Sequence, residues 1–291
     1  MLSILIPTYN YNITPLVSDL HKQCSALQVD FEICVLDDAS TQYIKENKSI
    51  EQFSYTIHTV LEKNIGRTAA RQQLANQANY DWLLFLDADV SIIHNNFIAT
   101  YIQYIKNKKI DSIYGGISYA EKSPSAATTL RWYYGKKREA LPAEKRRKFP
   151  YNIISQNLLI KKEVFLNVNV HLENVYGLDI VFSNELKKQN ASILHIDNTI
   201  RHDGLENNED FLRKSLKAVE TTVIFEKKGI LTDNCRSLQR MYSILRKTGV
   251  LKPIVFLTRL FLNPIEKKII GNTPSIFLFD LYRLNYYVRL K

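Results

Sequence analysis

The feature that most constrains the fold of this chain is an alternation of short apolar segments with helix-like segments. Each apolar segment has the length of a buried strand, and the segments between repeat their apolar residues at helical spacing. The strand-like segments are residues 2–7, 31–36, 55–61 and 82–86, and the helix-like segments are residues 15–27, 66–79 and 95–106. This alternation predicts a parallel α/β sheet covered by helices on both faces.

The pattern changes in the second half of the chain. Further strand-like segments lie at residues 112–119, 153–160 and 192–196, and residues 177–189 have helical spacing. Residues 120–150 break the alternation and predict a loop or a helix lying over the sheet. From about residue 216 the chain is basic and helical in character. We therefore expect an α/β domain over residues 1–215 and a helical C-terminal extension over residues 216–291.

Polar residues follow three of the predicted strands at the point where each strand ends. The clusters are Thr8-Tyr9-Asn10, Asp37-Asp38 and Asp87-Ala88-Asp89. In open α/β sheets, ligands bind beyond the carboxyl ends of the strands. The sequence therefore predicts a ligand site where these three clusters converge.

Asp87 and Asp89 are the side chains of this edge best suited to chemistry. Two carboxylates just past a buried strand can converge on a hard divalent cation such as Mg²⁺ or Mn²⁺. An ion bridging a diphosphate would neutralise the charge that develops as a nucleoside diphosphate leaves. The alternative is that both acids only stabilise the N-terminus of the next helix.

The second strand and the helix at residues 66–79 offer nucleotide contacts. Asp38 can accept a hydrogen bond from a nucleobase or a ribose hydroxyl, or the acidic pair can form an Asx turn with Ser40 as a helix cap. Arg71 lies one turn beyond Arg67 and can face a nucleotide, or both can be surface arginines. The phosphate-binding patterns GxxxxGK[ST] and GxGxxG are absent from the sequence.

The cysteines and the N-terminus favour a cytoplasmic protein. Cys24, Cys34 and Cys235 are too few and too scattered for a disulfide framework, and no CxxC spacing suggests zinc. The first seven residues are apolar but lack the basic region and the cleavage site of a signal peptide.

Positive charge is concentrated at the C-terminal end of the chain. The formal net charge is +10, and residues 216–291 hold fourteen Lys or Arg against five Asp or Glu. No apolar run approaches the roughly 18 residues that a membrane span requires, whereas interfacial helices on anionic headgroups fit residues 250–291. We therefore expect a peripheral contact with the inner face of the plasma membrane. The alternative is a helical subdomain that packs on the catalytic core or dimerises.

Four motifs occur in order: Pro7-Thr8-Tyr9-Asn10, Asp37-Asp38-Ala39-Ser40, Asn64-Ile65-Gly66 through Ala70-Arg71, and Phe85-Leu86-Asp87-Ala88-Asp89. Together they resemble the N-terminal half of a family 2 glycosyltransferase with the GT-A fold. The later segment 155–160 resembles the family's strand before the acceptor site. The resemblance covers residues 2–205 and implies a Rossmann-like mixed sheet flanked by helices.

The resemblance also implies roles for the matched residues. The nucleotide-sugar contacts would be Pro7, Thr8, Tyr9, Asp38, Arg71, Asp87 and Ala88, the ligands of Mn²⁺ or Mg²⁺ would be Asp89 and His202, and the acceptor contacts would be Gln156 and Asn157. A lone histidine such as His202 can instead be a structural hydrogen-bonding residue. Within the basic run 131–148, Trp132 can stack on an acceptor sugar if this run is a flap, or the run can be an exposed helix with solvated charges.

Inverting sugar transfer also needs a general base for the acceptor hydroxyl. Members of the family usually supply it from a Glu-Asp pair at the start of a helix. Here Leu178 stands in place of the Glu, and Asp179 matches the Asp, so Asp179 is the expected base, with Glu173 and Glu185 as substitutes. The alternative is that Asp179 only caps its helix.

These observations predict an inverting, metal-dependent hexosyl- or N-acetylhexosaminyltransferase. It would move a sugar from a nucleotide-sugar donor, UDP-linked, to a hydroxyl of a glycan or lipid-linked acceptor in cell-surface polysaccharide synthesis. Leu178 suggests the alternative of a non-catalytic nucleotide- or glycan-binding relative. A nucleic-acid-binding protein fits the pI near 9.3 but not the acids at three strand ends, so no nucleic-acid partner is expected.

Overall fold

The computed structural model describes residues 1–107, 109–123, 125–232 and 234–291. Contacts divide the chain into two compact units, each assembled from separate stretches. The first unit comprises residues 1–119, 140–174 and 185–204, and the second comprises residues 120–139, 175–184 and 205–291. The sequence pattern places a boundary near residue 215 because it shows where strands are replaced by helices. It does not show which separate stretches of the chain pack together.

The first unit contains the strands and the helices that cover them. Its strands are β1 (Leu2–Thr8), β2 (Phe31–Asp37), β3 (Thr56–Val60), β4 (Trp82–Leu86), β5 (Val90–Ile92), β6 (Ser112–Tyr114), β7 (Ile117–Ser118), β8 (Asn157–Lys161), β9 (Ile193–His195) and β10 (Ile200–His202). Its helices are α1 (Thr14–Leu27), α2 (Ile44–Lys48), the 3₁₀ helix η1 (Ser49–Gln52), α3 (Arg67–Gln77), α4 (Phe97–Ile105), α6 (Ala143–Arg146) and α7 (Lys162–Val168).

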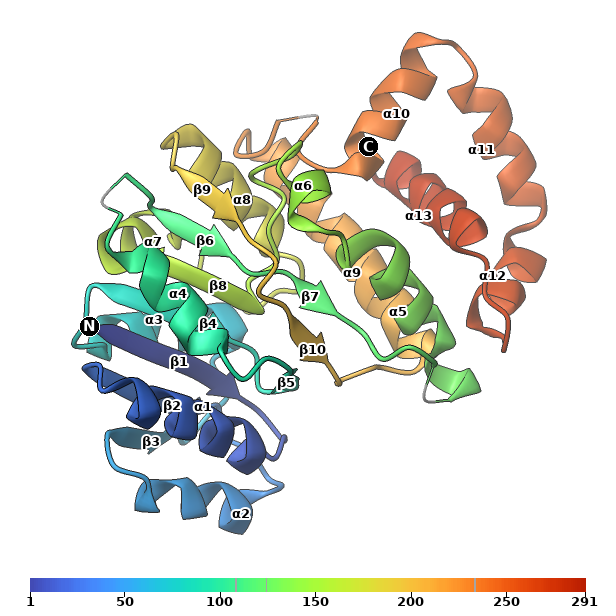
Figure 1. Cartoon of the computed structure of the whole chain (residues 1–291). Helices are drawn as coiled ribbons and strands as arrows, with labels where there is room; N and C mark the ends of the chain where they lie inside the picture. Colours follow the sequence, from blue (N-terminus) through green and yellow to red (C-terminus); the bar gives the residue numbers. More distant parts are fainter. Residues whose placement is uncertain (108, 124, 233) are drawn as a thin grey trace. The chain divides into compact units, whose positions relative to one another are not determined.

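The main sheet is mixed, as the resemblance implies. Its strand order is β3-β2-β1-β4-β8-β6-β9, and β5, β10 and β7 form a small second sheet. The first four strands of the main sheet are parallel, and β8 runs antiparallel to both β4 and β6. Helices α1 and α4 pack together on one face, and α3 and α7 on the other (Figure 1). Every residue of β1, β2 and β4 is buried, because the helices cover both faces.

Three local expectations about this unit are wrong. The strand predicted over 112–119 is broken at Gly115 and Gly116 into β6 and β7, which join different sheets. Gly116 has φ +88°, and a Cβ on Gly115 would lie 2.1 Å from the hydroxyl of Tyr101, so the tight break needs both glycines. The strand predicted from residue 153 begins only at Asn157, and the helix predicted to begin after a Thr14 cap includes Thr14 itself.

The second unit is helical, in agreement with the predicted C-terminal extension. Its elements are the 3₁₀ helix η2 (Ala126–Thr128), α5 (Thr129–Tyr134), the π-helical turn η3 (Gly135–Glu139), α9 (Asn208–Lys227), α10 (Ser237–Lys247), α11 (Leu251–Leu260), α12 (Leu262–Ile270) and α13 (Ile276–Leu290). Helix α8 (Asp179–Lys188) begins in the second unit and ends in the first. Helix α13 contacts α9, α10, α11 and α12, and so forms the centre of the helical layer.

A buried asparagine ties the second unit together at the start of α9. The Oδ1 atom of Asn208 accepts a hydrogen bond from the backbone N–H of Leu130 at 2.8 Å. Its Nδ2 atom donates toward the carbonyl oxygens of Ala126, Ile270 and Gly271 at 3.0 to 3.2 Å. One side chain thus satisfies backbone groups from three segments that lie far apart in the sequence.

Two further features of the fold are its thiols and the apolar character of its helices. All three cysteines are free thiols, and burial raises the pKa of Cys24 and of Cys34 to about 12, so both stay protonated at neutral pH. In the part of the chain that the structure describes, no helix combines the length and the apolar character needed to cross a bilayer.

Candidate active site

The site begins at the carboxyl ends of β1 and β4. Strands β2 and β3 extend the sheet from one side of β1, and β4 then returns to its other side. The pairing of β1 with β4 ends at Leu5 and Phe85, before either strand stops. In open α/β sheets, ligands bind where the strand order reverses in this way. Thr8 ends β1 and Asp87 follows β4, so two of the three predicted clusters lie at this reversal.

Asp38 joins β1, β2 and the start of α3. Its carboxylate accepts hydrogen bonds from the backbone N–H groups of Ile65 at 2.7 Å and Gly66 at 2.9 Å. Its own N–H donates to the carbonyl oxygen of Thr8 at 2.9 Å. Because a carboxylate oxygen has more than one lone pair, these bonds fix the acid in place and leave it able to accept further hydrogen bonds.

Hydrogen bonds connect the loop after β1 to the loop after β2. Ser40 donates its N–H to Asp37 Oδ1 at 2.7 Å, a bond of the Asx kind that the sequence offered as an alternative. The other part of that alternative is wrong, because α2 begins only at Ile44 and Ser40 does not cap it. Asn10 Oδ1 accepts from the N–H groups of Thr41 at 2.7 Å and Gln42 at 3.1 Å. Between these anchored residues Tyr9 is 54% exposed, and its ring is open to contact with a ligand.

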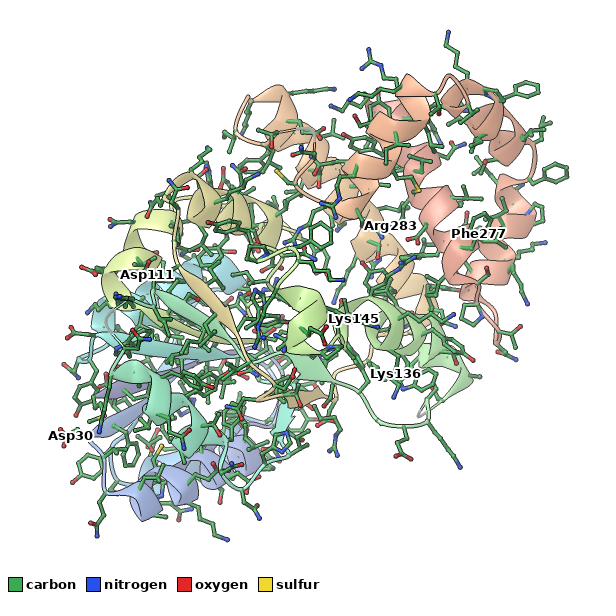
Figure 2. The ribbon with its side chains drawn as sticks, turned by 45° about the horizontal axis from the view of Figure 1, so that its top comes forward. Asp30, Asp111, Lys136, Lys145, Phe277 and Arg283 are labelled. Atoms are coloured by element: carbon green, nitrogen blue, oxygen red, sulfur yellow. The ribbon has the colours of Figure 1, made fainter. Side chains whose placement is uncertain are left out.

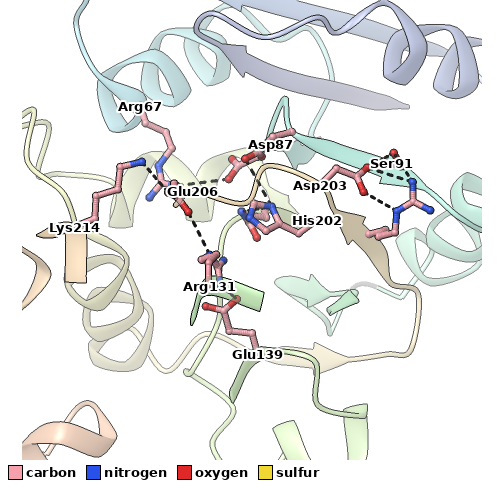
Figure 3. A network of polar contacts seen from close by, with 12 residues as sticks. Arg67, Asp87, Ser91, Arg131, Glu139, His202, Asp203, Glu206 and Lys214 are labelled. Carbon is pink, nitrogen blue, oxygen red and sulfur yellow. Dashed lines mark hydrogen bonds and ion pairs between the residues drawn. The ribbon is translucent and has the colours of Figure 1, made fainter. Parts of the chain in front are cut away.

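The acid that follows β4 is neutralised by two arginines from α3. Arg71, itself buried, donates to Asp87 Oδ1 and also reaches the carbonyl oxygen of Ser155 at 3.4 Å. Arg67 Nη1 lies 3.6 Å from Asp87 Oδ2, and its side chain is 40% exposed (Figure 3). The spacing of one helical turn places both guanidinium groups on one carboxylate. Arg71 therefore acts on the site through Asp87, with Arg67 at the solvent side.

Asp89 meets His202 on the adjoining small sheet. Asp89 Oδ2 lies 3.7 Å from His202 Nδ1, and the imidazole is buried edge-on against the ring of Tyr119. The carbonyl oxygen of Asp89 accepts hydrogen bonds from the N–H groups of Asp203 and Gly204 at 2.9 and 3.3 Å. A Cβ on Gly204 would lie 2.0 Å from Asp89 Oδ2, so this glycine makes room for the carboxylate.

The two predicted acceptor residues at the start of β8 occupy different surroundings. Gln156 Nε2 lies 3.3 Å from His202 Nδ1, and Gln156 Oε1 is buried with no hydrogen-bond partner among the described residues. Asn157 is fully buried and bonded to Tyr101, to the carbonyl of Gly116 and to the carbonyl of Asn198. Gln156 therefore belongs to the neighbourhood of Asp89, whereas the amide of Asn157 holds β8 in the sheet.

The residues present fit a divalent ion that takes only part of its ligands from protein. Among the described residues, no three His, Cys, Asp or Glu side chains gather into a metal site. Asp89 Oδ2 and His202 Nδ1 are nevertheless 3.7 Å apart. A single ion with ligand distances of roughly 2.0–2.2 Å can therefore contact both atoms. Mg²⁺ and Mn²⁺ commonly complete such a pair with phosphate oxygens and water.

Asp179 and Trp132 belong to the second unit. Asp179 is the first residue of α8, and its carbonyl oxygen accepts from Arg236 at 3.3 Å. Leu178 beside it is buried in an apolar cluster with Val181 and Phe225, which explains why an apolar residue stands there. Trp132 donates its indole N–H to the carbonyl oxygen of Ala120 at 2.8 Å.

A network of ion pairs surrounds the buried Arg131, next to Trp132, in the second unit. Arg131 Nη1 donates to Glu139 at 3.0 Å, and its Nε lies 3.5 Å from Glu206 (Figure 3). Lys214 donates to the other oxygen of Glu206 at 2.8 Å. Part of the predicted basic run is thus an internal ion pair and not a solvated charge.

Sequence reasoning missed three residues that shape the first-unit site. Arg67 was considered only as a neighbour of Arg71, yet it contacts the same carboxylate. Gly204 follows His202-Asp203, and its closeness to Asp89 depends on a sheet pairing that no sequence pattern announces. Burial raises the pKa of Tyr11, and the charges of Asp89 and Asp203 raise it further, so Tyr11 shares their surroundings.

Solved structures with a similar fold include two sugar-phosphate synthases. Glucosyl-3-phosphoglycerate synthase from Mycobacterium tuberculosis, in complex with Mn²⁺, UDP-glucose and phosphoglyceric acid, has a TM-score of 0.52 at 14% identity. Mannosyl-3-phosphoglycerate synthase from Rubrobacter xylanophilus has a TM-score of 0.54 at 13% identity. The matches cover 80% of this chain and 81% and 76% of those chains. The likeness establishes the GT-A fold.

Curated relatives and a family comparison complete the assignment. An uncharacterized glycosyltransferase of Haemophilus influenzae is 28% identical over 185 residues, or 58% of this chain and 55% of the relative. Undecaprenyl-phosphate 4-deoxy-4-formamido-L-arabinose transferase of Proteus mirabilis is 31% identical over 94 residues, or 30% of this chain and 28% of the relative. The chain thus spans about half the length of the Haemophilus influenzae relative and a smaller share of the Proteus mirabilis relative. The model of glycosyl transferase family 2 matches residues 3–166, more than half of the chain. This chain therefore belongs to glycosyl transferase family 2.

Proposed function

We propose that this protein is an inverting, metal-dependent glycosyltransferase that uses a UDP-sugar donor. The observation that carries the proposal is the meeting of Asp89 with His202 at the carboxyl end of β4, beside an Asp87 held by two arginines. The fold relatives support it, because the Mycobacterium tuberculosis synthase was solved with Mn²⁺ and UDP-glucose. Asp89 and His202 would hold Mn²⁺ or Mg²⁺, which supplies positive charge against the departing diphosphate.

The nucleotide would lie across the ends of β1 and β2. Pro7 and Thr8 end β1, and Tyr9 follows them with an exposed ring that suits stacking on a base. Thr8 Oγ1 is buried without a hydrogen-bond partner among the described residues, so a ligand hydroxyl would satisfy it. Asp38 is fixed by two backbone N–H groups and would accept from the base, and Asp87 with Ala88 would face the ribose. The hydrogen bond from Arg71 orients Asp87.

In the transfer step, Asp179 would accept the proton of the acceptor hydroxyl. The hydroxyl oxygen then forms a bond to the anomeric carbon of the sugar, and the bond from that carbon to the diphosphate oxygen breaks. The electron pair of the broken bond leaves with the diphosphate, and the anomeric configuration inverts. Asp179 is the first residue of α8, where a carboxylate interacts favourably with the positive end of the helix dipole. The proton acceptor for the hydroxyl would thus lie on a regular helix.

The acceptor would be a hydroxyl of a glycan or of a lipid-linked sugar, in the synthesis of a cell-surface polysaccharide. The Proteus mirabilis relative supports a lipid-linked acceptor, because its name specifies undecaprenyl phosphate. Gln156 has an unpaired buried amide oxygen, which suits contact with an acceptor or with the sugar being transferred. Trp132 would stack on an acceptor sugar, as aromatic faces commonly do.

A thermal-shift series tests the donor class. The purified protein is melted with UDP, GDP, ADP or CDP, each with and without Mn²⁺. We expect UDP with Mn²⁺ to raise the melting temperature most, because stabilisation follows the occupancy of the folded state. Equal melting temperatures with all four nucleotides, with or without Mn²⁺, would contradict the proposal.

The assignment of the base has its own test. Asp179→Asn keeps the shape of the side chain but removes its ability to accept a proton. We expect kcat to fall by about 10²–10⁴-fold with little change in the affinity for UDP. Glu173→Gln and Glu185→Gln serve as matched controls, because Glu173 precedes α8 and Glu185 lies within it. A larger loss of kcat in either control than in Asp179→Asn would move the role of base to that residue.

A further inference from the structure

Helix α11 carries apolar residues on two opposite faces. Leu251, Val255 and Thr258 are buried, and the first two pack in a cluster with Leu284 and Tyr287. This inner face explains how α11 is held in the second unit. It accounts for only two of the seven apolar residues in the helix, Leu251 and Val255.

The other face of α11 is apolar and open to solvent. Pro253, Phe256, Leu257 and Leu260 are spaced i, i+3, i+4 and i+7, so they share one side of the helix. Phe256, Leu257 and Leu260, which we call the outer stripe, are each more than half exposed. Phe261 follows directly and is also more than half exposed. Such a contiguous set is unusual for a surface that faces only water.

The basic residues around the outer stripe indicate what covers it. Residues 240–270 contain seven Lys or Arg and one acidic residue, Glu266. Lys252 and Arg259 are exposed and lie seven positions apart, so they follow the same flank of α11 beside the outer stripe. Phe277, at the start of α13, is a further exposed ring of the same unit (Figure 2).

This charge pattern distinguishes between two possible occupants. A second copy of the chain would bring two strongly basic surfaces together, and the like charges would oppose association. Anionic lipid headgroups instead attract Lys and Arg at the edge of an amphipathic helix while its apolar residues enter the acyl boundary. The length of α11 suits a helix lying in the plane of the interface, since it is too short to span.

We propose that α11 docks on the surface of an anionic bilayer through its outer stripe. Phe256, Leu257 and Leu260 enter the boundary between headgroups and acyl chains, and Lys252 and Arg259 lie on the anionic headgroups. The two contributions act together, since a single apolar side chain or a single cation binds a bilayer only weakly.

Co-sedimentation of the full-length protein with vesicles tests this proposal. The vesicles are phosphatidylcholine with or without phosphatidylglycerol, and no sugar donor is present. We expect binding only to the vesicles that contain phosphatidylglycerol, and weaker binding at higher salt. In Phe256→Ser/Leu260→Ser, the partition coefficient should fall at least about tenfold because the buried apolar area is lost. In Lys252→Gln/Arg259→Gln, it should fall about tenfold on anionic vesicles.

A matched control is Ile44→Ser, which removes an exposed apolar side chain from α2 of the first unit and should leave the partition unchanged. All variants change exposed side chains, so circular dichroism melting curves should coincide with the wild-type curve. Unchanged partition of Phe256→Ser/Leu260→Ser would overturn the proposal. So would a dimer seen by analytical ultracentrifugation without vesicles that the same substitutions abolish. Because the assay needs no donor, it succeeds or fails independently of the proposed transfer reaction.

Discussion

The two units of this chain place their charged groups differently. In the first unit, Asp38 and Asp87 are buried at strand ends, and hydrogen bonds or arginines hold each of them. In the second unit, most basic residues of α10, α11 and α12 lie at the surface beside exposed apolar side chains. Buried, oriented charges are suited to a small polar ligand, whereas exposed cations beside apolar rings are suited to an extended partner.

The difference also explains why the ligand site of the first unit can be predicted from the sequence, whereas the exposed surface of the second unit cannot. Parallel strands bring their carboxyl ends to one edge whatever the details of packing, so motifs after strands mark a site. A helical layer has no such edge. Its surface can be recognised only once the structure shows which apolar residues the neighbouring helices cover.

The largest expected effect on stability comes from the arginines that contact Asp87. Arg71→Met leaves a buried carboxylate without its main partner, which should cost about 3–5 kcal/mol of unfolding free energy. Arg67→Met removes a partly exposed partner of the same acid and should cost about 0–1 kcal/mol. Urea unfolding measures both. Equal losses in the two variants would show that the first unit does not depend on the buried pair.

A second pair of variants tests whether buried polar groups matter equally in both units. Asn157→Ala in the first unit and Asn208→Ala in the second each leave several backbone or hydroxyl groups unsatisfied. We expect each to cost about 1–3 kcal/mol in urea unfolding. The exposed Asn263→Ala is the control and should have almost no effect. If only Asn208→Ala caused a negligible loss of unfolding free energy, buried asparagines would not contribute equally to the stability of the two units.

The smallest expected effect is a dependence of the second unit on acid pH. Burial alone would raise the pKa of Glu206, but the hydrogen bond and charge of Lys214 and the charge of Arg131 outweigh it and lower that pKa below its usual 4.5. A carboxyl with a lowered folded pKa stabilises the protein above its unfolded pKa and loses this contribution as pH falls through the folded value. Urea midpoints from pH 7 down to about 3 should therefore fall less steeply in Glu206→Gln than in the wild type.

Much of the first unit follows from its sequence, for reasons that particular residues illustrate. The acids after β2 and β4 were identifiable because each follows a continuous apolar run, and the GT-A fold was implied by motifs in a fixed order. The contact of Asp89 with His202 was implied only by resemblance, since it depends on β5 pairing with β10 more than a hundred residues later. Gly115 and Gly116 were not recognised as a strand break, because their effect depends on Tyr101 packing against Gly115 and Arg146 packing against Gly116.

The second unit could be predicted in outline only. Its helical and basic character follows from composition, but the apolar residues of α11 look alike in the sequence whether they face the core or the solvent. Val255 is buried and Phe256 is exposed because of where α13 lies, which is a property of tertiary packing. The ion pair of Arg131 with Glu139 and Glu206 was likewise hidden within a run of charges that resembles a solvated surface.

The central claim is that Asp89 is a ligand of the metal that holds the donor diphosphate. Its most direct test is isothermal titration of UDP in the presence and absence of Mn²⁺ into the wild type, Asp89→Ala and Asp81→Ala. Asp81 is an exposed acid just before the opposite end of β4, and so is a matched control. We predict that Mn²⁺ strengthens UDP binding at least about tenfold in the wild type and in Asp81→Ala but not in Asp89→Ala. Retention of the full Mn²⁺ effect in Asp89→Ala would contradict the claim.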